Sequence, residues 1–433
     1  MSESETATGR APGFSTLAVH AGAAPDPTTG ARATPVYQTT SFVFEDVDHA
    51  ASLFGLQAFG NIYSRITNPT NAVLEERIAA LEGGTAALAV ASGHAAQMLA
   101  FHALMEPGDE FVAADRLYGG SINQFTHAFK SFGWQVKWAK GDDPASFRAA
   151  LTEKTKAIFV ESIANPGGTV TDIAAIAEVA REAGVPLIVD NTLATPYLVR
   201  PIEHGADIVV HSLTKYVGGH GNSLGGVIVD SGKFPWADHA ERFPQLTQPE
   251  PSYHGVVYTE AFGPAAFIGR VRTVPLRNTG AALAPMNAFL LLQGLETLSL
   301  RMERHVDNAL RVAHHLKHHP KVAWVSYAGL PGHPHYPLAE KYMAGRPSAI
   351  LSFGLKDGYE AGVRFYDALK IFKRLVNIGD AKSLACHPAS TTHRQLSEEE
   401  QAKAGVKPEM IRLSVGIEAI EDILADLDQA LEA

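Results

Sequence analysis

Short apolar runs alternate with amphipathic segments between residues 70 and 279, and this alternation constrains the fold more than any other feature. The apolar runs are rich in β-branched and aromatic residues, which favours strands, and the segments between them have helical periodicity. The expected strands are 111–114, 135–139, 157–163 and 226–229, and the expected helices are 71–82, 95–105, 122–132 and 173–183. Strands that alternate with helices form a mostly parallel sheet covered by helices, so the sequence predicts an α/β fold.

The apolar run 208–210 is expected to be a buried strand, and Lys215 and a glycine-rich turn follow it closely. Ser212 and Thr214 place short hydroxyl side chains beside this lysine. A lysine amine can form a Schiff base with an aldehyde, and neighbouring hydroxyl groups can bind a phosphate on the same molecule. These residues indicate a phosphate-bearing aldehyde as cofactor, although the segment alone is equally compatible with a surface lysine after a strand.

Another apolar run, 184–189, ends on the carboxylate of Asp190, 25 residues before Lys215. If both runs are parallel strands of one sheet, their carboxyl ends lie at the edge where open α/β sheets bind ligands. An aspartate at this edge can pair with a protonated pyridine nitrogen, and the cationic ring then withdraws electrons from a carbanion. The alternative for Asp190 is the N-cap of a helix that follows the strand.

The segment 86–97 runs from a predicted strand through Ser92 and Gly93 into an alanine-rich helix. Backbone N–H groups at the start of a helix attract phosphate, and Gly93 permits a close approach of the backbone. Ser92 is expected to cap the helix or to bind the phosphate directly. Tyr118 follows the predicted strand 111–114, where its ring can stack on an aromatic cofactor at the same sheet edge.

Composition limits the class of protein. The 433 residues, of which 46% are hydrophobic, are enough for two or three domains with a large core. The net charge of −10 argues against nucleic acid or an anionic membrane as a partner. The single cysteine, Cys386, excludes an intramolecular disulfide and fits a reducing compartment. Residues 1–12 lack an apolar signal segment and no apolar run reaches about 18 residues, so we expect a cytoplasmic protein without a membrane span.

We expect three parts along the chain. Residues 1–69 form an N-terminal arm that is rich in turn residues, which suits an extended contact with a neighbouring subunit. Residues 70–283 form the cofactor-binding domain, and residues 284–433 form a smaller C-terminal α/β domain that begins with one long helix, 286–319. The stretch 234–276 is interpreted as an insertion at the mouth of the site or as a subunit contact.

Four histidines of the predicted long helix have the i, i+4 spacing of metal ligands on one helix face. They are His314, His315, His318 and His319. No acidic or cysteine partner accompanies them in the sequence, so a solvated helix end is the favoured interpretation and no metal is expected.

The ordered set of motifs resembles the Cys/Met-metabolism family of pyridoxal-phosphate enzymes over about residues 16–418. The matching motifs are Tyr63-Ser64-Arg65, Ser92-Gly93, Tyr118, Asn165-Pro166, Asp190, Ser212-Leu213-Thr214-Lys215, Ser383 and Arg412-Leu413-Ser414-Val415-Gly416-Ile417-Glu418. The resemblance implies the aspartate-aminotransferase-like fold, also called fold type I, and pyridoxal phosphate as cofactor. His94 stands where the family often has methionine, a harmless change if only the backbone N–H of residue 94 touches the phosphate.

The resemblance also implies roles around the cofactor. Lys215 carries pyridoxal phosphate as a Schiff base and then moves the α-proton, while Tyr118 stacks on the ring and assists as a second acid or base. Asp190 meets the pyridine nitrogen. The phosphate is held by Ser92, Gly93, His94, Ser212 and Thr214. Tyr63 and Arg65 reach the phosphate of the neighbouring subunit, so the site needs at least a homodimer, and pairs of dimers form a tetramer.

The resemblance further implies that Arg412 clamps the substrate α-carboxylate as a bidentate fork, helped by Asn165 and Ser383. The segments 383–401, 291–298 and 249–262 are similar to the O-acetylhomoserine sulfhydrylases of the family. Methionine γ-lyases typically carry a cysteine two positions after the stacking tyrosine, where this chain has Gly120.

The implied reaction is γ-substitution of an amino-acid ester, O-acetyl-L-homoserine, by sulfide or methanethiol, which gives homocysteine or methionine. A cystathionine γ-synthase or γ-lyase is the alternative within the family, and a non-catalytic binding or assembly relative is the alternative of another class. An acetyl and a succinyl ester leave from the same γ-carbon, so both esters, and sulfide, methanethiol or cysteine as sulfur donor, stay open.

Overall fold

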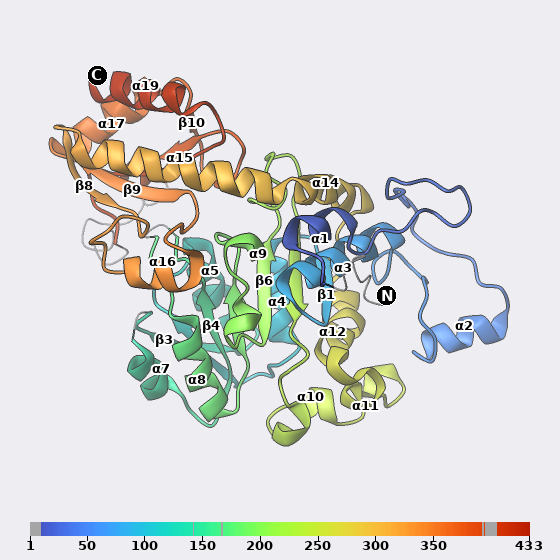
Figure 1. Ribbon diagram of the computed structural model, residues 1–433. Helices are drawn as coiled ribbons and strands as arrows, with labels where there is room; N and C mark the ends of the chain where they lie inside the picture. The colour runs from blue at the N-terminus through green and yellow to red at the C-terminus, as the bar shows by residue number, and fades with distance from the viewer. Residues whose placement is uncertain (1–9, 142, 166–167, 392–393, 395–404) are drawn as a thin grey trace.

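The computed structural model describes residues 10–141, 143–165, 168–391, 394 and 405–433 (Figure 1). A seven-stranded sheet forms its centre, in the order β1-β7-β6-β5-β4-β2-β3. The strands are β1 (Ala86–Val90), β2 (Glu110–Ala114), β3 (Gln135–Ala139), β4 (Thr155–Glu161), β5 (Leu187–Asp190), β6 (Ile208–Ser212) and β7 (Gly226–Asp230). Strands β2 to β6 are parallel, and β7 runs antiparallel between β1 and β6. The predicted α/β fold with a mostly parallel sheet is confirmed.

The register of the central strands brings the last residues of β4 and β5 level with one another, and β6 continues two residues further, to Ser212. Glu161 of β4 lies opposite Asp190 of β5, and Asp190 lies opposite Val210 of β6. β4 and β5 are buried along almost their whole lengths, which explains why their sequences are continuous apolar runs rather than alternating ones. Two of these runs therefore end on carboxylates at the same edge of the sheet.

Helices pack against the sheet where the sequence predicts them. They include α3 (Pro69–Glu82), α4 (Gly93–His102) and α8 (Ile173–Ala183), and the predicted helix 122–132 corresponds to α5 (Gly119–Asn123), the π-helical turn η1 (Gln124–Ala128) and α6 (Phe129–Ser131). α3 and α4 contact β1 and β7, and α8 contacts β5. α3 begins at Asn68, whose side chain accepts the Thr70 N–H, and ends at Gly83 with φ of 74°. Of the helices in the described ranges, none combines the length and apolar character needed to cross a membrane.

A second, five-stranded sheet contains residues from the C-terminal part of the chain. Its order is β10-β11-β12-β9-β8, with β8 (Val322–Ser326), β9 (Ile350–Leu355), β10 (Lys373–Arg374), β11 (Leu384–Cys386) and β12 (Met410–Ser414). α15 (Leu298–His318) and α17 (Gly358–Ala368) pack against this sheet, and α19 (Ile420–Leu431) packs against both helices. The second sheet is the smaller α/β unit that the sequence predicts, while the boundaries at residues 69/70 and 283/284 stay predictions.

The predicted single helix 286–319 is wrong, because the structure divides it at Thr297. α14 (Pro285–Glu296) ends there, and α15 starts at the next residue. A Cβ atom at Gly294 would lie 2.4 Å from the carbonyl oxygen of Gly218, so α14 packs directly on the loop that follows Lys215. Arg301 of α15 donates hydrogen bonds to the carbonyl groups of the same loop, 2.6 Å to Tyr216 and 3.1 Å to Val217. Because of the break, α14 and α15 both contact the loop that follows Lys215.

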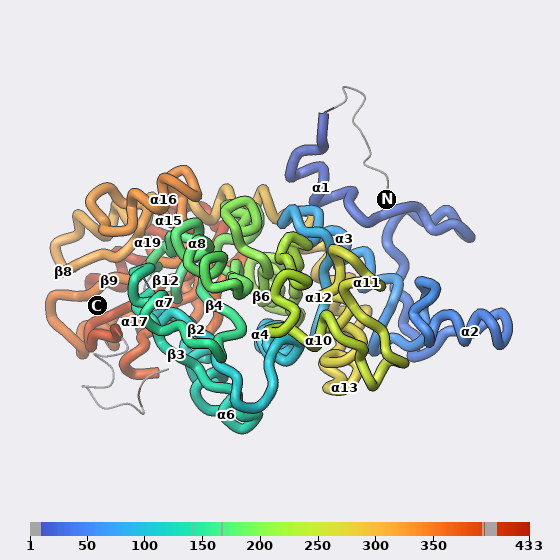
Figure 2. Tube along the Cα trace, turned by 90° about the horizontal axis from the view of Figure 1, so that it is seen from below, coloured from blue at the N-terminus to red at the C-terminus, as the bar shows by residue number. Residues whose placement is uncertain are grey.

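The N-terminal arm contains α1 (Phe14–His20) and α2 (Val47–Phe54). α1 was not predicted, because seven residues are too few for a helical period, and its packing on α3 and α14 stabilises it instead. Figures 1 and 2 both place α2 at the opposite end of the molecule from β8 and β9.

The stretch 234–276 folds into short helices, of which α12 (Ala266–Val271) packs on β1, β7 and α4. None of its residues, all of which are described, lines the cavity presented below. Within one chain this stretch therefore does not form the wall of the cavity, and its interpretation as an insertion at the mouth of the site stays a prediction. A subunit contact stays a prediction.

A fully buried carboxyl group lies at the end of β7. Asp230 accepts the Gly232 N–H at 2.9 Å through Oδ1, and its Oδ2 has no partner among the described residues. Burial, together with a smaller contribution from the charge of the neighbouring Asp207, raises the pKa of Asp230 to about 7. Near neutral pH the folded protein therefore binds a proton that the unfolded chain releases.

Asp230→Asn should flatten the dependence of thermal stability on pH. Because the folded pKa of about 7 lies above the unfolded value near 3.8, the bound proton stabilises the folded state fully below pH 3.8, and this stabilisation is lost as the pH rises through 7. Between pH 5 and 8 the wild-type protein should lose about 2–3 kcal/mol that the variant does not lose. Melting temperatures of both proteins across this range measure the effect, and parallel curves would contradict it.

Candidate active site

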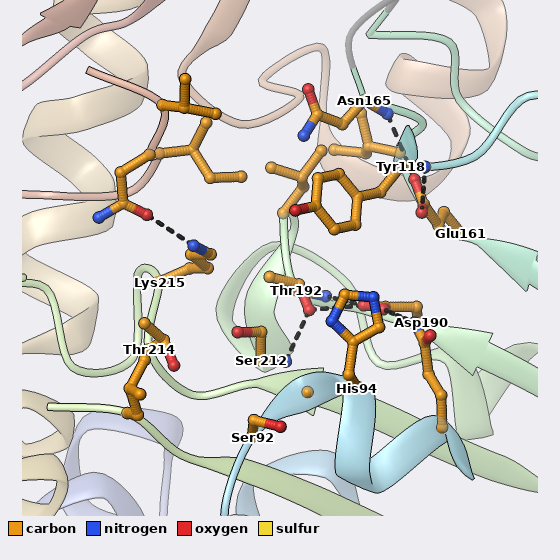
Figure 3. Close-up of a pocket in the computed structure, with 18 of the residues that line it drawn as sticks. Ser92, His94, Tyr118, Glu161, Asn165, Asp190, Thr192, Ser212, Thr214 and Lys215 are labelled. Atoms are coloured by element: carbon orange, nitrogen blue, oxygen red, sulfur yellow. Dashed lines mark hydrogen bonds between the residues drawn. The ribbon is translucent and has the colours of Figure 1, made fainter. Parts of the chain in front are cut away.

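A cavity lies at the carboxyl ends of the parallel strands, and residues of the second domain close it from the other side (Figure 3). Its walls bring together the predicted site residues Ser92, Gly93, His94, Tyr118, Asn165, Asp190, Ser212, Thr214, Lys215 and Arg412. The walls also contain four polar residues that the sequence analysis missed, Gln97, Glu161, Thr192 and Asn377. Tyr63, Arg65 and Ser383 lie elsewhere in the structure.

One corner of the cavity is built from the start of α4 and the end of β6. Ser92 is the N-cap of α4, and its Oγ accepts the Ala95 N–H at 3.1 Å. The first N–H groups of a helix have no partner within it, so this corner presents donors to an anion. A Cβ atom at Gly93 would lie 2.8 Å from the Cβ of Ser212, so the turn packs against β6 only because residue 93 is glycine. Thr214 is joined to Gly225 through its hydroxyl group, at 3.1 and 3.2 Å.

The carboxylate of Asp190 is fixed by three donors. Its Oδ1 accepts the backbone N–H of Thr192 at 3.0 Å and the Thr192 hydroxyl at 2.5 Å. Its Oδ2 accepts Nε2 of Gln97 at 3.1 Å. Gln97 and Thr192 follow Gly93 and Asp190 closely in the sequence, but only the tertiary structure shows that both point at the same carboxylate. The arrangement holds an oriented acceptor for a protonated ring nitrogen.

Tyr118 is the N-cap residue of α5 and lines the cavity with the start of α4. Its ring lies over Gly120, where a Cβ atom would be 2.3 Å from the tyrosine Cε1. The ring of His94 lies beside it, with 5.9 Å between the centroids. Glycine at position 120 is therefore required for this ring placement.

Glu161 is the most buried carboxyl group in the cavity wall. Burial raises its pKa well above the usual range for a glutamate, and the negative charge of Asp190 adds to the rise. Its oxygens accept the N–H groups of Tyr118 and Asn165, which oppose the rise. A sequence signal existed, because Glu161 ends an apolar run in the same way as Asp190.

Lys215 follows β6 and directs its amine into the cavity. Nζ donates to the side-chain oxygen of Asn377 at 2.6 Å. Burial lowers the pKa of this amine, and the nearby Arg412 lowers it further. A lysine in this environment reaches its neutral, nucleophilic form at a lower pH than an exposed lysine does.

Arg412 of β12 approaches from the second sheet and is 8% exposed. Nη1 donates to Oδ1 of Asn165 at 3.3 Å, and Nη2 donates to the carbonyl of Asn377 at 3.2 Å. Its buried Nε has no partner among the described residues. A buried guanidinium with an unused N–H group is suited to an anionic ligand such as a carboxylate.

Ser383 does not line the cavity. Its hydroxyl donates to Oε2 of Glu418 at 2.9 Å and accepts the Gly416 N–H at 2.8 Å. Tyr63 and Arg65 lie in the arm, where Nη1 of Arg65 donates to the carbonyl of Arg277 at 2.5 Å. Pro166, Thr392, His393 and 395–401 of the predicted motifs lie outside the described residues.

The described residues of the predicted long helix hold no metal-like cluster. His315 hydrogen-bonds Asp428 at 2.5 Å, and His318 hydrogen-bonds the carbonyl of His314 at 2.8 Å. No group of three or more histidine, cysteine, aspartate or glutamate side chains within the described ranges is arranged to hold a metal ion.

The cavity residues fit pyridoxal phosphate: a helix start for the phosphate, a fixed carboxylate for the ring nitrogen and a buried lysine for the aldehyde. The sequence profile of the family described as Cys/Met metabolism PLP-dependent enzyme matches residues 15–432. The chain belongs to this family. Pyridoxal phosphate is therefore its cofactor, and the protein is a pyridoxal-phosphate-dependent enzyme.

Relatives of the family are similar to the chain over nearly its whole length. O-acetyl-L-homoserine sulfhydrylase 1 of Thermus thermophilus is 56% identical over 96% of this chain and 99% of its own. Homocysteine synthase of Schizosaccharomyces pombe is 54% identical over 97% and 98%. A solved structure from Campylobacter jejuni, described as an O-acetylhomoserine (thiol)-lyase with N′-pyridoxyl-lysine-5′-monophosphate, has a TM-score of 0.93 and 43% identity, covering 98% of this chain and all of that one.

Arg412→Lys tests the expected carboxylate clamp. Lysine keeps the charge but cannot offer the planar fork, so binding of an amino-acid substrate should weaken by about 2 kcal/mol. The KM for the amino acid should rise about thirty-fold while the absorbance of the bound cofactor stays the same. Arg270→Lys is the matched control, because Arg270 is equally buried but pairs with Glu250 away from the cavity. An unchanged KM in Arg412→Lys would place the carboxylate elsewhere.

Proposed function

We propose that this enzyme replaces the acetyl ester of O-acetyl-L-homoserine by sulfide or methanethiol, giving homocysteine or methionine and acetate. The observation that carries the proposal is the full-length similarity to O-acetyl-L-homoserine sulfhydrylases, 56% identity over 96% of the chain for the Thermus protein. The cavity supports the proposal, because groups suited to bind the cofactor and groups suited to bind a substrate carboxylate line the same cavity.

The residues that hold the cofactor come from the large sheet and its loops. Nζ of Lys215 holds the aldehyde carbon, Asp190 pairs with the ring nitrogen and Tyr118 stacks on the ring. The phosphate is held by Ser92, Gly93, His94, Ser212 and Thr214. Bound there, pyridoxal phosphate supplies an electron sink for negative charge at the substrate α-carbon.

Lys215 moves the protons of the reaction. Its lowered pKa favours the neutral amine, the form that can take the α-proton, at a lower pH than for an exposed lysine. The hydrogen bond to Asn377 fixes the direction of this amine. Loss of a second proton, from the β-carbon, would supply the electron pair that breaks the Cγ–O bond and expels acetate. The sulfur nucleophile would then form the Cγ–S bond, and protons would return to the β- and α-carbons, with Tyr118 as a second acid or base.

Arg412 binds the α-carboxylate through its free Nε and an adjacent N–H, and Asn165 is the polar neighbour that orients it. Ser383 contributes to carboxylate binding indirectly. Its hydroxyl accepts the Gly416 N–H and so fixes the turn that follows β12, the strand that carries Arg412.

Steady-state rates test the reaction. O-acetyl-L-homoserine and O-succinyl-L-homoserine should each be assayed with sulfide, methanethiol and cysteine. We expect the acetyl ester with sulfide or methanethiol to give the highest kcat/KM. Lys215→Ala is the control, and it should abolish both turnover and the borohydride-reducible link to the cofactor. Preference for cysteine, with cystathionine as product, would instead support the γ-synthase alternative.

We also propose that the enzyme is a homo-oligomer in the cytoplasm. Tyr63 and Arg65 lie on the arm with partly exposed side chains, and the Arg65 guanidinium lies over the Tyr63 ring at 5.5 Å. We propose that this pair reaches the phosphate in a partner subunit, within dimers that pair into tetramers.

Subunit complementation tests the shared site. Arg65→Ala chains and Lys215→Ala chains should each be nearly inactive. In a mixed dimer one site combines an intact Lys215 with an intact Arg65 from the partner, so activity should return. If mixed dimers form and activity stays at the level of the parents, Arg65 acts within its own chain.

A further inference from the structure

Glu161 occupies a position that no predicted role explains. It is the last residue of β4, it lines the cavity, and it is 5% exposed. One carboxylate oxygen accepts the backbone N–H of Tyr118 at 2.7 Å, and the other accepts the backbone N–H of Asn165 at 3.2 Å (Figure 3). Both oxygens of a single side chain are thus bonded to backbone groups of two separate segments.

The two segments carry the two sides of the cavity. Tyr118 follows β2 and presents the ring that is proposed to stack on the cofactor. Asn165 follows β4, and its side chain accepts a hydrogen bond from Arg412, the proposed carboxylate ligand. The Glu161 carboxylate therefore joins the cofactor side of the cavity to the substrate side.

Burial of the Glu161 carboxyl group costs free energy of folding, which argues that this group has a function. Glu161 is buried and lies level with Asp190 in the neighbouring strand, so two carboxyl groups share one edge of the sheet. A buried carboxylate without strong hydrogen-bond donors destabilises the folded state. The two N–H groups offset part of this cost, and a neutral residue of similar size would avoid it.

We propose that Glu161 is a positioning residue, whose carboxylate sets the spacing between the Tyr118 ring and the Asn165 side chain, and thereby aligns the cofactor ring with the substrate carboxylate. The inference deepens the proposed function and rests on it for the substrate. It does not rest on the identity of the ester, because both segments are held before any substrate binds.

Glu161→Gln and Glu161→Ala are the test variants. Glutamine keeps one acceptor and presents an N–H₂ group to the second N–H, whereas alanine removes both acceptors. Misplacement of reacting groups by about 1 Å can lower a rate about a hundred-fold, so we expect a fall of about this size in kcat for alanine and of about ten-fold for glutamine. The KM for the amino acid should rise in both variants.

Two measurements without turnover accompany the rates. Amide hydrogen exchange of the cofactor-free protein should show lost protection at Tyr118 and Asn165. Visible circular dichroism of the cofactor-loaded protein should change, because the signal depends on how the ring is held. A purely structural role would lower the melting temperature while leaving kcat, KM and the circular dichroism at their wild-type values, and that result would overturn the proposal.

A double-mutant cycle separates the two sides. If Glu161 acts on KM through Asn165, the effect of Glu161→Gln on KM should disappear in an Asn165→Ala background. Independent, multiplying effects on KM would overturn that part of the proposal.

Glu110→Gln is the matched control, since Glu110 is buried in the neighbouring parallel strand but begins β2, at the opposite end of the sheet. It should leave exchange at Tyr118 and Asn165 and the circular dichroism unchanged. If the wild-type enzyme does not turn over O-acetyl-L-homoserine, the proposed function fails, yet exchange and circular dichroism still decide the role of Glu161.

Discussion

The level register of β4, β5 and β6 is the constraint on which the rest of the structure depends. It places Glu161 beside Asp190, and Ser212 at the carboxyl end of the next strand. Because side chains alternate between the faces of a strand, a slip of one residue would turn Asp190 to the other face and separate it from Gln97. β7, which pairs with β6, approaches the Ser92-Gly93 turn so closely that a Cβ atom at Gly226 would lie 2.1 Å from the carbonyl oxygen of Ser92.

Among the described residues, Lys215 and Arg412 form no salt bridge with a carboxylate. Both donate to Asn377, Lys215 to its side-chain oxygen and Arg412 to its carbonyl group, and Arg412 also donates to the side chain of Asn165. Burial lowers the pKa of both groups, and the charge of Arg412 lowers the pKa of Lys215 further. Perturbed pKa values of this kind are common at functional sites.

Much of this arrangement could be predicted from the sequence, because strand ends and helix starts leave local signals. The apolar runs that end at Asp190 and shortly before Lys215 gave both the sheet and the residues at its edge. Gln97, Thr192 and Asn377 leave no such signal, since their roles depend on contacts between distant segments. Ser383 matched a motif, but only the fold shows that Glu418 and Gly416 occupy its hydroxyl. The break at Thr297 arises from packing against the Gly218 loop, which a helical period cannot reveal.

In the proposed function, the two ends of an amino-acid substrate would be recognised by groups from different sheets. The amine side would face Lys215, which follows β6 of the seven-stranded sheet, and the carboxylate side would face Arg412 of the five-stranded sheet. A bound substrate would then connect the two sheets mechanically. The distance between its nitrogen and its carboxylate would set their separation, and ligands that lack either end would leave that separation to the protein alone.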